Sequence, residues 1–316
     1  MSLGICIIGI YFGKLPNYFE LWLKSAENNP EIDFLIFTDC EWKELPQNIR
    51  FVQSSLADIK KRAERVLGQE VELSKPYKCC DYRPCFGLMF SEYLKEYAYW
   101  GHCDFDMIFG NISSFFNKYA YSNYDKFLSQ GHLAIYRNTV ENNKRFMLHG
   151  SKCGEISEVF HSPEAFAFDE TSGIGSIFEE NGFDYFKERI FADITPIHKR
   201  FTLTGDGQNY KNQLFYWENG KVFREYKTDN MYQKEEFLYI HFQKRGSLPI
   251  HFELAECDSF YITSKGFYIK NSLVTDNEVK KYNRFYSVLF EKGEDFQHFY
   301  KLWIFRIKRK LGLLYR

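Results

Sequence analysis

The chain has 316 residues, of which 45% are hydrophobic and 26% charged, a composition typical of globular proteins. A formal net charge of −1 gives no electrostatic footprint for nucleic acid, and no run approaches the roughly 18 apolar residues that a membrane span needs. The eight cysteines contain no CxxC spacing, so we expect reduced thiols, no zinc site and a cytoplasmic protein.

The first half of the chain alternates strand-like and helix-like segments. Apolar, β-branched runs predict strands, and apolar residues at helical spacing predict helices. In chain order, we expect a strand over 4–12, a helix over 16–29, a strand over 33–39, helices over 55–68 and 83–97, a strand within 99–112 and a strand over 131–138. Because the opening apolar run has no basic residues before it, we interpret it as a strand and not a secretory signal. Strands separated by helices predict an α/β fold with a mostly parallel sheet flanked by helices.

The later part of the chain has a different composition. After about residue 200, Tyr, Phe and Lys dominate, the strand-like segments look shorter, and 201–213 has the composition of a loop. The segment "FLYIHFQKR" predicts a strand that ends at His241. We expect two parts, a main domain over 1–250 and a C-terminal helical extension over 251–316 that ends in a basic, aromatic helix.

Two acidic residues stand near the end of the strand expected within 99–112. Only Phe105 separates Asp104 from Asp106, so on a strand their carboxylates project to the same side. Converging carboxylates repel each other unless a cation lies between them, and Mg²⁺ or Mn²⁺ suits such oxygen ligands. The spacing alone is a weak signal, but the apolar and aromatic context favours a metal site over a solvated pair.

No glycine-rich phosphate loop is present, so a phosphate would have to be held by a metal and by basic side chains. The basic candidates are Lys78 and Arg83 in one segment and Lys244 and Arg245 in another. Arg83 could clamp a diphosphate through forked hydrogen bonds; the alternative is a solvated loop with one Asp–Arg pair. His241 is either a third metal ligand or a structural histidine.

Five segments spread over roughly residues 4–250 form a set: "GIYFGKLP", "FTD", "KPYKCCDYRPCFG", "YWGHCDFDMIFGNI" and "YIHFQKR". Together they resemble bacterial capsular and lipopolysaccharide glycosyltransferases of the GT-A fold. The resemblance implies a GT-A-like catalytic domain and the metal-dependent transfer of a sugar from a nucleotide-diphosphate donor to a glycan or lipid-linked acceptor. The resemblance implies a role in cell-surface polysaccharide synthesis. It also implies a UDP-sugar as the donor, because such donors are usual in these glycosyltransferases.

The resemblance also implies roles for individual residues. Asp104, Asp106 and His241 match the positions of metal ligands, with Mn²⁺ or Mg²⁺ as the ion. Residues expected around the nucleoside and the phosphates of the donor are Gly9, Tyr11, Phe12, Thr38, Asp39, Lys78, Arg83, Lys244 and Arg245. For Tyr11 and Phe12 the alternative is plain core packing.

An inverting enzyme of this kind needs a carboxylate near the acceptor hydroxyl, whereas a retaining one has no obvious base. Asp169 and Glu170, just before the glycine-containing segment 172–176, are the candidates for this catalytic role. Either residue could instead be a helix cap or a solvated charge. Whether the configuration of the sugar is retained or inverted stays open.

The last sixteen residues, 301–316, contain six Lys or Arg and no acidic residue. A basic helix with Trp, Phe and Leu suits an anionic membrane surface, so peripheral contact with the inner face of the cell membrane is one expectation. The alternative is a helix docked on the body with a basic outer face. Two rival functions remain: another metal-dependent phosphate-processing enzyme, and a non-catalytic sugar-binding protein of the same fold.

Overall fold

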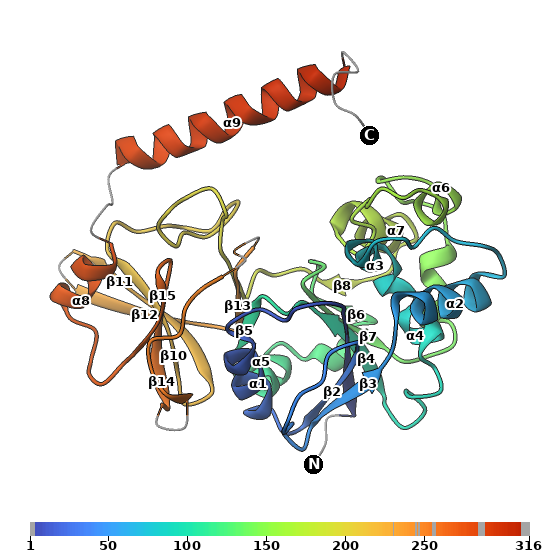
Figure 1. Cartoon of the computed structure of the whole chain (residues 1–316), viewed down its shortest axis with the longest axis horizontal. Helices are drawn as coiled ribbons and strands as arrows, with labels where there is room; N and C mark the ends of the chain where they lie inside the picture. Colours follow the sequence, from blue (N-terminus) through green and yellow to red (C-terminus); the bar gives the residue numbers. More distant parts are fainter. Residues whose placement is uncertain are drawn as a thin grey trace. The chain divides into compact units, whose positions relative to one another are not determined.

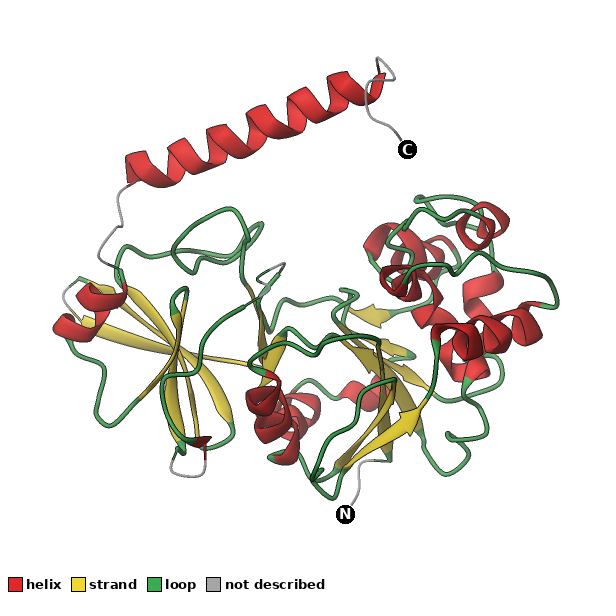
Figure 2. Ribbon diagram, in the orientation of Figure 1, coloured by secondary structure: helices red, strands yellow, loops and turns green. Residues whose placement is uncertain are grey.

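The structure, a computed structural model, describes residues 4–229, 231–243, 245, 247–254, 257–283 and 288–310. It is mixed α/β, with several sheets and with helices in both parts (Figures 1 and 2). The chain divides into two compact units, Met1–Ile190 and Phe191–Arg316. The boundary expected at residue 250 therefore falls inside the second unit.

A seven-stranded sheet forms the centre of the N-terminal unit (Figure 1), with the strands in the order β3-β2-β1-β4-β7-β6-β8. The strands are β1 (Ile5–Tyr11), β2 (Ile32–Thr38), β3 (Ile49–Gln53), β4 (Tyr99–Cys103), β6 (Lys126–Phe127), β7 (Leu133–Arg137) and β8 (Tyr185–Phe186). β1 pairs in parallel with β2 and β4, β2 with β3, and β6 with β8, whereas β7 is antiparallel to β4 and β6. The prediction of a mostly parallel sheet is confirmed.

Helices cover both faces of this sheet. On one face lies α1 (Phe19–Glu27), and Trp22 packs edge-on against Phe34 of β2 at 5.4 Å between ring centroids. On the other face, α2 (Leu56–Leu67) and α4 (Phe86–Met89) share a core with the sheet that includes Ile8 and Phe37. Shorter helices complete the unit: α3 (Cys79–Tyr82), α5 (Ile112–Lys118), α6 (Ile156–His161) and α7 (Ser176–Glu180).

The helix expected over 83–97 is wrong in length. Arg83–Cys85 forms a 3₁₀ turn, α4 follows, and the chain then turns irregularly before β4. Arg62 of α2 donates to the carbonyl of Met89 at 3.2 Å, which is a carbonyl that a longer helix would use for its own ladder. By contrast, α2 has the expected limits, because Ser55 forms a capping box with Asp58 and Gly68 ends the helix at φ 68°.

The C-terminal unit is built around a five-stranded antiparallel sheet in the order β12-β11-β10-β14-β15 (Figure 2). These strands are β10 (Gln213–Glu218), β11 (Lys221–Thr228), β12 (Met231–Phe237), β14 (Ser259–Thr263) and β15 (Gly266–Ile269). The expectation of shorter strands here is wrong, and so is that of a purely helical extension after residue 250. Two short parallel strands, β9 (Ala192–Asp193) and β13 (Tyr239–His241), also belong to this unit.

Two helices end the described chain, α8 (Asp276–Tyr282) and α9 (Val288–Lys310). The helix expected near the C-terminus is therefore confirmed for residues 301–310 and begins earlier than expected, while 311–316 lie outside the described residues. Among the described helices, none has the length and apolar character required to cross a membrane.

Candidate functional site

The parallel strands β1 to β4 bring several predicted site residues to one edge of the N-terminal sheet, because their carboxyl ends meet there. Asp39, just after β2, accepts a hydrogen bond from the backbone N–H of Gly13 at 2.9 Å. Thr38 is buried, and its hydroxyl oxygen accepts from the N–H of Cys40 at 3.1 Å. Tyr11 ends β1 and is only partly buried. This edge therefore presents an exposed carboxylate beside a phenol ring.

Gly9 has a packing role. A Cβ atom on Gly9 would lie 2.5 Å from Cζ of Phe105 and 2.8 Å from Cδ1 of Ile36, so only glycine leaves room for the Phe105 ring. Phe105 is buried and meets Tyr11 edge-on at 5.1 Å. Phe12 is half-buried against the core, as its alternative interpretation supposed. Phe105, the residue between the two aspartates, thus packs the segment that carries them into the core.

Asp104 and Asp106 do not project from one strand, and that prediction is wrong. β4 ends at Cys103 and β5 covers Met107–Phe109, so both aspartates lie in the bend between the two strands. The backbone N–H of Asp104 donates to the carbonyl of His132 at 2.9 Å, which extends the β4–β7 pairing by one residue. Both carboxylates are half-buried at the sheet edge. The bend, not strand periodicity, determines where they point.

The guanidinium of Arg83 connects Asp104, a candidate metal ligand, to Asp169, the candidate catalytic base. Arg83 donates from Nη2 to Oδ1 of Asp104 and from Nη1 to Oδ2 of Asp169, the latter at 2.8 Å. Its Nη1 also donates to the carbonyl of Gly131 at 2.8 Å. Burial opposes the charge of Arg83, but the carboxylates of Asp104 and Asp169 outweigh that effect and raise its pKa well above the usual range. The expected Asp–Arg pair exists, but its partners differ and it is partly buried and not solvated.

Asp169 is almost wholly buried, with 2% of the residue exposed. Burial raises the pKa of its carboxyl from 3.8 to about 7, despite the opposing charge of Arg83, and the neighbouring Glu170 and Asp104 add to the rise. This carboxyl therefore exchanges its proton near neutral pH, as a general base must. Neither a helix cap nor a solvated charge describes it.

Glu170 and a buried lysine that sequence reasoning missed complete the network. Burial raises the pKa of Glu170, and a hydrogen bond with the backbone of Gly131 opposes the rise. Lys126 of β6 is fully buried, donates to the carbonyl of Leu128, and has its ammonium 4.7 Å from the centre of the Tyr185 ring. Burial lowers the pKa of Lys126 to about 7, while Glu170 and Asp169 act to raise it.

Gly131 makes the close approach of these carboxylates possible. A Cβ atom there would lie 2.7 Å from Cγ of Asp169 and 2.9 Å from Oε1 of Glu170. Because β7 is antiparallel to β4, the residues just before β7 lie beside the residues just after β4. The only sequence signal for this arrangement was a glycine at the first position of the strand expected over 131–138.

Lys78 is placed differently from the prediction. It is 2% exposed, and its ammonium donates to Oδ2 of Asp81 at 2.7 Å, to the carbonyl of Val159 at 2.6 Å and to the carbonyl of Glu164. All three N–H groups are therefore used inside the fold. Lys78 holds the 75–84 segment in place and is not available to bind a phosphate.

The residue before Lys78 faces solvent instead. Tyr77 is 75% exposed, the highest value of any described aromatic residue in the N-terminal unit. Partial burial of its hydroxyl raises the pKa, and the neighbouring Cys80, Asp169 and Asp104 raise it further. Tyr77 thus places a free ring face beside the Arg83 network.

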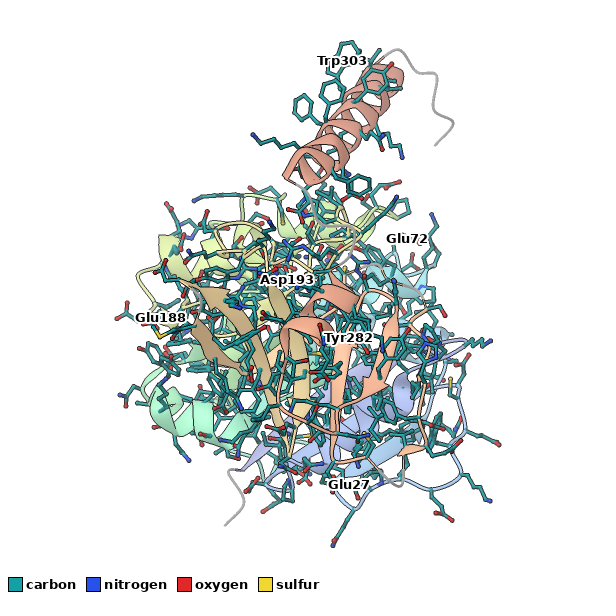
Figure 3. All side chains as sticks on the ribbon, turned by 90° about the vertical axis from the view of Figure 1, so that its left-hand side faces the viewer. Glu27, Glu72, Glu188, Asp193, Tyr282 and Trp303 are labelled. Carbon is teal, nitrogen blue, oxygen red and sulfur yellow. The ribbon has the colours of Figure 1, made fainter. Side chains whose placement is uncertain are left out.

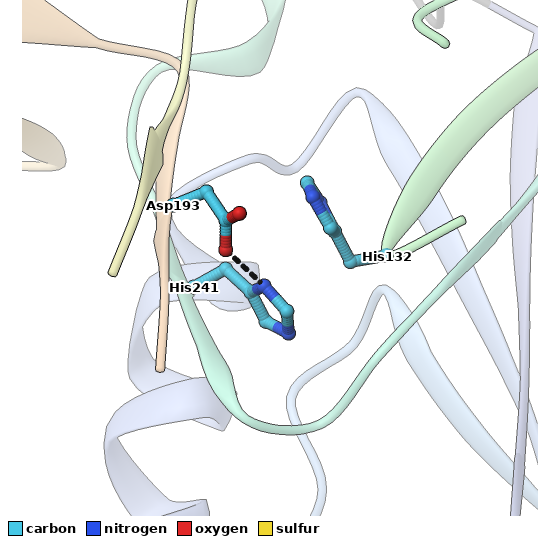
Figure 4. Close-up of side chains that lie close together, drawn as sticks. All are labelled: His132, Asp193 and His241. Carbon is cyan, nitrogen blue, oxygen red and sulfur yellow. Dashed lines mark hydrogen bonds and ion pairs between the residues drawn. The ribbon is translucent and has the colours of Figure 1, made fainter. Parts of the chain in front are cut away.

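In the C-terminal unit, His241 ends β13 as predicted and is buried. Figure 4 shows its ring in contact with the carboxylate of Asp193. Its Nδ1 is 2.8 Å from Oδ1 of Asp193 on β9, and the parallel pairing of β13 with β9 puts these two residues opposite each other. The other oxygen of Asp193 accepts from the hydroxyl of Thr204 and from Nε2 of Gln243, each at 2.7 Å. A carboxylate that fixes Nδ1 in this way is the usual partner of a histidine that binds a metal through Nε2.

Arg245 has a structural role, because its guanidinium binds backbone carbonyls within the C-terminal unit. Its Nη2 donates to the carbonyls of Thr195 at 2.9 Å and His198 at 2.7 Å, and the guanidinium lies 4.8 Å from the Phe201 ring centre. We therefore withdraw its expected role in phosphate binding. Lys244, the other basic residue expected there, lies outside the described residues.

Each unit by itself offers side chains that suit a divalent ion. In the N-terminal unit, Asp104 and Asp106 offer carboxylate oxygens. In the C-terminal unit, His241 offers an imidazole nitrogen that Asp193 orients. Mn²⁺ accepts both oxygen and imidazole ligands, and Mg²⁺ prefers the oxygens.

Fold and site together define a mixed α/β protein with a partly buried Arg–carboxylate network at the carboxyl edge of its main sheet. The chain belongs to the DUF6625 family, a family of unknown function, which it matches over residues 7–271. No curated protein matches the chain.

Proposed function

We propose that this protein is a metal-dependent glycosyltransferase with a GT-A-like N-terminal unit. The observation that carries the proposal is the Arg83 network, in which one guanidinium holds Asp104 of the D-x-D segment and the buried Asp169 together. An inverting, metal-dependent site of this kind needs a metal-binding acidic pair close to a proton-accepting carboxylate. The contact of Arg83 with both Asp104 and Asp169 supports such an arrangement, at a sheet edge where α/β proteins bind ligands.

Asp104 and Asp106 would hold Mn²⁺ or Mg²⁺. A divalent ion there stabilises the negative charge of a diphosphate leaving group. In the C-terminal unit, His241 with its partner Asp193 is a candidate metal ligand in its own right. Asp39 and Tyr11 are the residues proposed to contact the nucleoside of a UDP-sugar, because a carboxylate can accept from the imide N–H and a ring can stack on the base. Tyr77 would stack on the acceptor glycan.

Asp169 is proposed to accept the proton of the attacking hydroxyl. Its pKa near 7 lets it be ionised in the resting enzyme and protonated after the transfer. Arg83 acts as a positioning residue, because its N–H groups are directed at Asp104, Asp169 and the Gly131 carbonyl. Glu170 and Lys126 set the charge around that carboxyl.

The test is release of UDP from a panel of UDP-sugars, with Mn²⁺, with Mg²⁺ and with a chelator. We expect metal-dependent release with at least one donor, reduced by about 100-fold or more in Asp104→Asn and Asp106→Asn, since removing charge stabilisation of this kind costs that much. Asp184→Asn is the matched control, because Asp184 is exposed in the same unit. Metal-independent release, or equal activity in all three variants, would contradict the proposal.

A further inference from the structure

Helix α9 is attached to the C-terminal unit through its acidic residues. The contacts are Glu291 with Arg200 at 2.9 Å, Asp295 with His198 at 2.9 Å, and Glu294 with the backbone N–H of Lys199 at 3.3 Å. All three acidic side chains of α9 are thus engaged by one short segment, 198–200. The acidic side of the helix therefore faces its own domain.

The aromatic residues of α9 are exposed to solvent. Phe296 is 70% exposed, Phe299 67%, Tyr300 52% and Trp303 55%. Figure 3 labels Trp303 on this helix, with aromatic side chains around it. Isolated exposed apolar residues are common on proteins, but four neighbouring aromatic rings on one helix mark a binding surface.

Helical geometry separates most of the acidic residues from the aromatic ones. The aromatic residues follow spacings of three, four and seven, so at about 100° per residue they form one continuous stripe. At the same angular step Glu291 and Glu294 project from the other side of the helix, and Asp295 lies one turn before Phe299 at the edge of the stripe. Contact with the 198–200 segment therefore leaves the aromatic stripe uncovered by that segment.

The charge of this part of the chain changes sign along the helix. The acidic residues lie in the first two turns of α9 and have partners within the unit. From 301 onward the sequence contains six Lys or Arg and no acidic residue. An aromatic stripe followed by a basic segment without acidic residues is the composition of helices that lie in the interface of an anionic bilayer.

We propose that α9 is a membrane-docking helix. Its aromatic stripe, Phe296, Phe299, Tyr300 and Trp303, enters the headgroup region of an anionic lipid bilayer, and the basic segment after residue 300 binds the lipid phosphates. The acidic contacts with 198–200 couple the docked helix to the C-terminal unit. This function is independent of the proposed transferase activity, and its test needs no turnover.

The test uses the full-length protein and sedimentation with vesicles of phosphatidylcholine alone or with 30% phosphatidylglycerol. We expect about tenfold more bound protein with the anionic vesicles, and a loss of that difference in high salt. Trp303 provides a second signal, because Trp22, Trp100 and Trp217 are fully buried and Trp303 is exposed. Its fluorescence should shift to the blue when the anionic vesicles are added, and Trp303→Phe should abolish most of that shift.

The variant Phe296→Ser/Phe299→Ser/Trp303→Ser removes three of the four rings of the stripe and leaves the three acidic residues of α9 unchanged. We expect its vesicle binding to fall to the level seen with phosphatidylcholine. Leu273→Ser is the matched control, because Leu273 is 83% exposed in the same unit and should bind vesicles as the wild type does. Equal binding by the triple variant and the wild type would overturn the proposal.

A second copy of the chain is the competing occupant of the stripe. Light scattering during size-exclusion chromatography separates the two cases. The proposal would also be overturned if the wild type is a dimer, the triple variant is a monomer, and neither kind of vesicle is bound. That result would show that α9 pairs with α9 of a second copy. A monomer that binds anionic vesicles is the expected result.

Discussion

The buried carboxyl of Asp169 makes protein stability depend on pH in a direction opposite to that of an ordinary ion pair. Its pKa rises from 3.8 to about 7 on folding, chiefly through burial. The folded state therefore binds this proton more tightly than the unfolded state. The contribution of Asp169 to stability is greatest below about pH 4 and is lost as the pH rises through 7. Since each pKa unit corresponds to about 1.4 kcal/mol, the full loss is about 4 kcal/mol.

Asp169→Asn removes this titration and keeps an oxygen acceptor for Arg83. In urea unfolding between pH 5 and pH 8, we expect the stability of the variant relative to wild type to increase by about 3 kcal/mol. Asp184→Asn, at an exposed site, should give a flat difference. A difference that is flat or of opposite sign for Asp169→Asn would show that the Arg83 ion pair outweighs burial, and the assignment of Asp169 as a neutral-pH base would fail.

Three further substitutions test the packing around the site. Gly131→Ala should destabilise the fold by about 1–3 kcal/mol in urea unfolding, because its Cβ would crowd Asp169 and Glu170; wild-type stability would refute the close approach. Lys78→Met should cost about 3–5 kcal/mol by leaving Asp81 as a buried, unpaired charge, and a shift below about 1 kcal/mol in thermal or urea unfolding would return Lys78 to the list of candidate ligands. Asp193→Asn should weaken Mn²⁺ binding about 10–100-fold by calorimetry without unfolding the chain, and unchanged affinity would show that His241 is not a metal ligand.

Local patterns predicted the regular elements of the N-terminal sheet well. The apolar runs at 4–12 and 33–39 and the capped helix over 55–68 match β1, β2 and α2, because both periodicity and end signals are local. The helix expected over 83–97 failed for a tertiary reason, since Arg62 takes the carbonyl that the next turn needed. In the C-terminal unit a local signal was overlooked. Asn219-Gly220, with φ 49° and 79°, forms the turn of the β10–β11 hairpin.

The site was predictable in part. Residue type and sequence context identified Asp104, Asp106, Asp169 and His241 as candidates. Asp104 is paired with Arg83, the pKa of Asp169 is raised, and His241 is oriented by Asp193. Sequence could not tell Lys78 from Arg83, because both are basic residues in one segment and only burial separates a structural cation from one that faces carboxylates. Lys126 and the space left by Gly131 depend on the antiparallel β4–β7 pairing, which no local pattern encodes.

The central claim is that Asp104 and Asp106 bind a divalent metal that holds a nucleoside diphosphate. Isothermal titration of UDP, with and without Mn²⁺, into the wild type and Asp104→Ala/Asp106→Ala tests it most directly. The account predicts UDP binding that requires Mn²⁺ and disappears in the double variant, while Asp184→Asn binds as the wild type does. UDP binding that needs no metal, or no binding under any of these conditions, would contradict it.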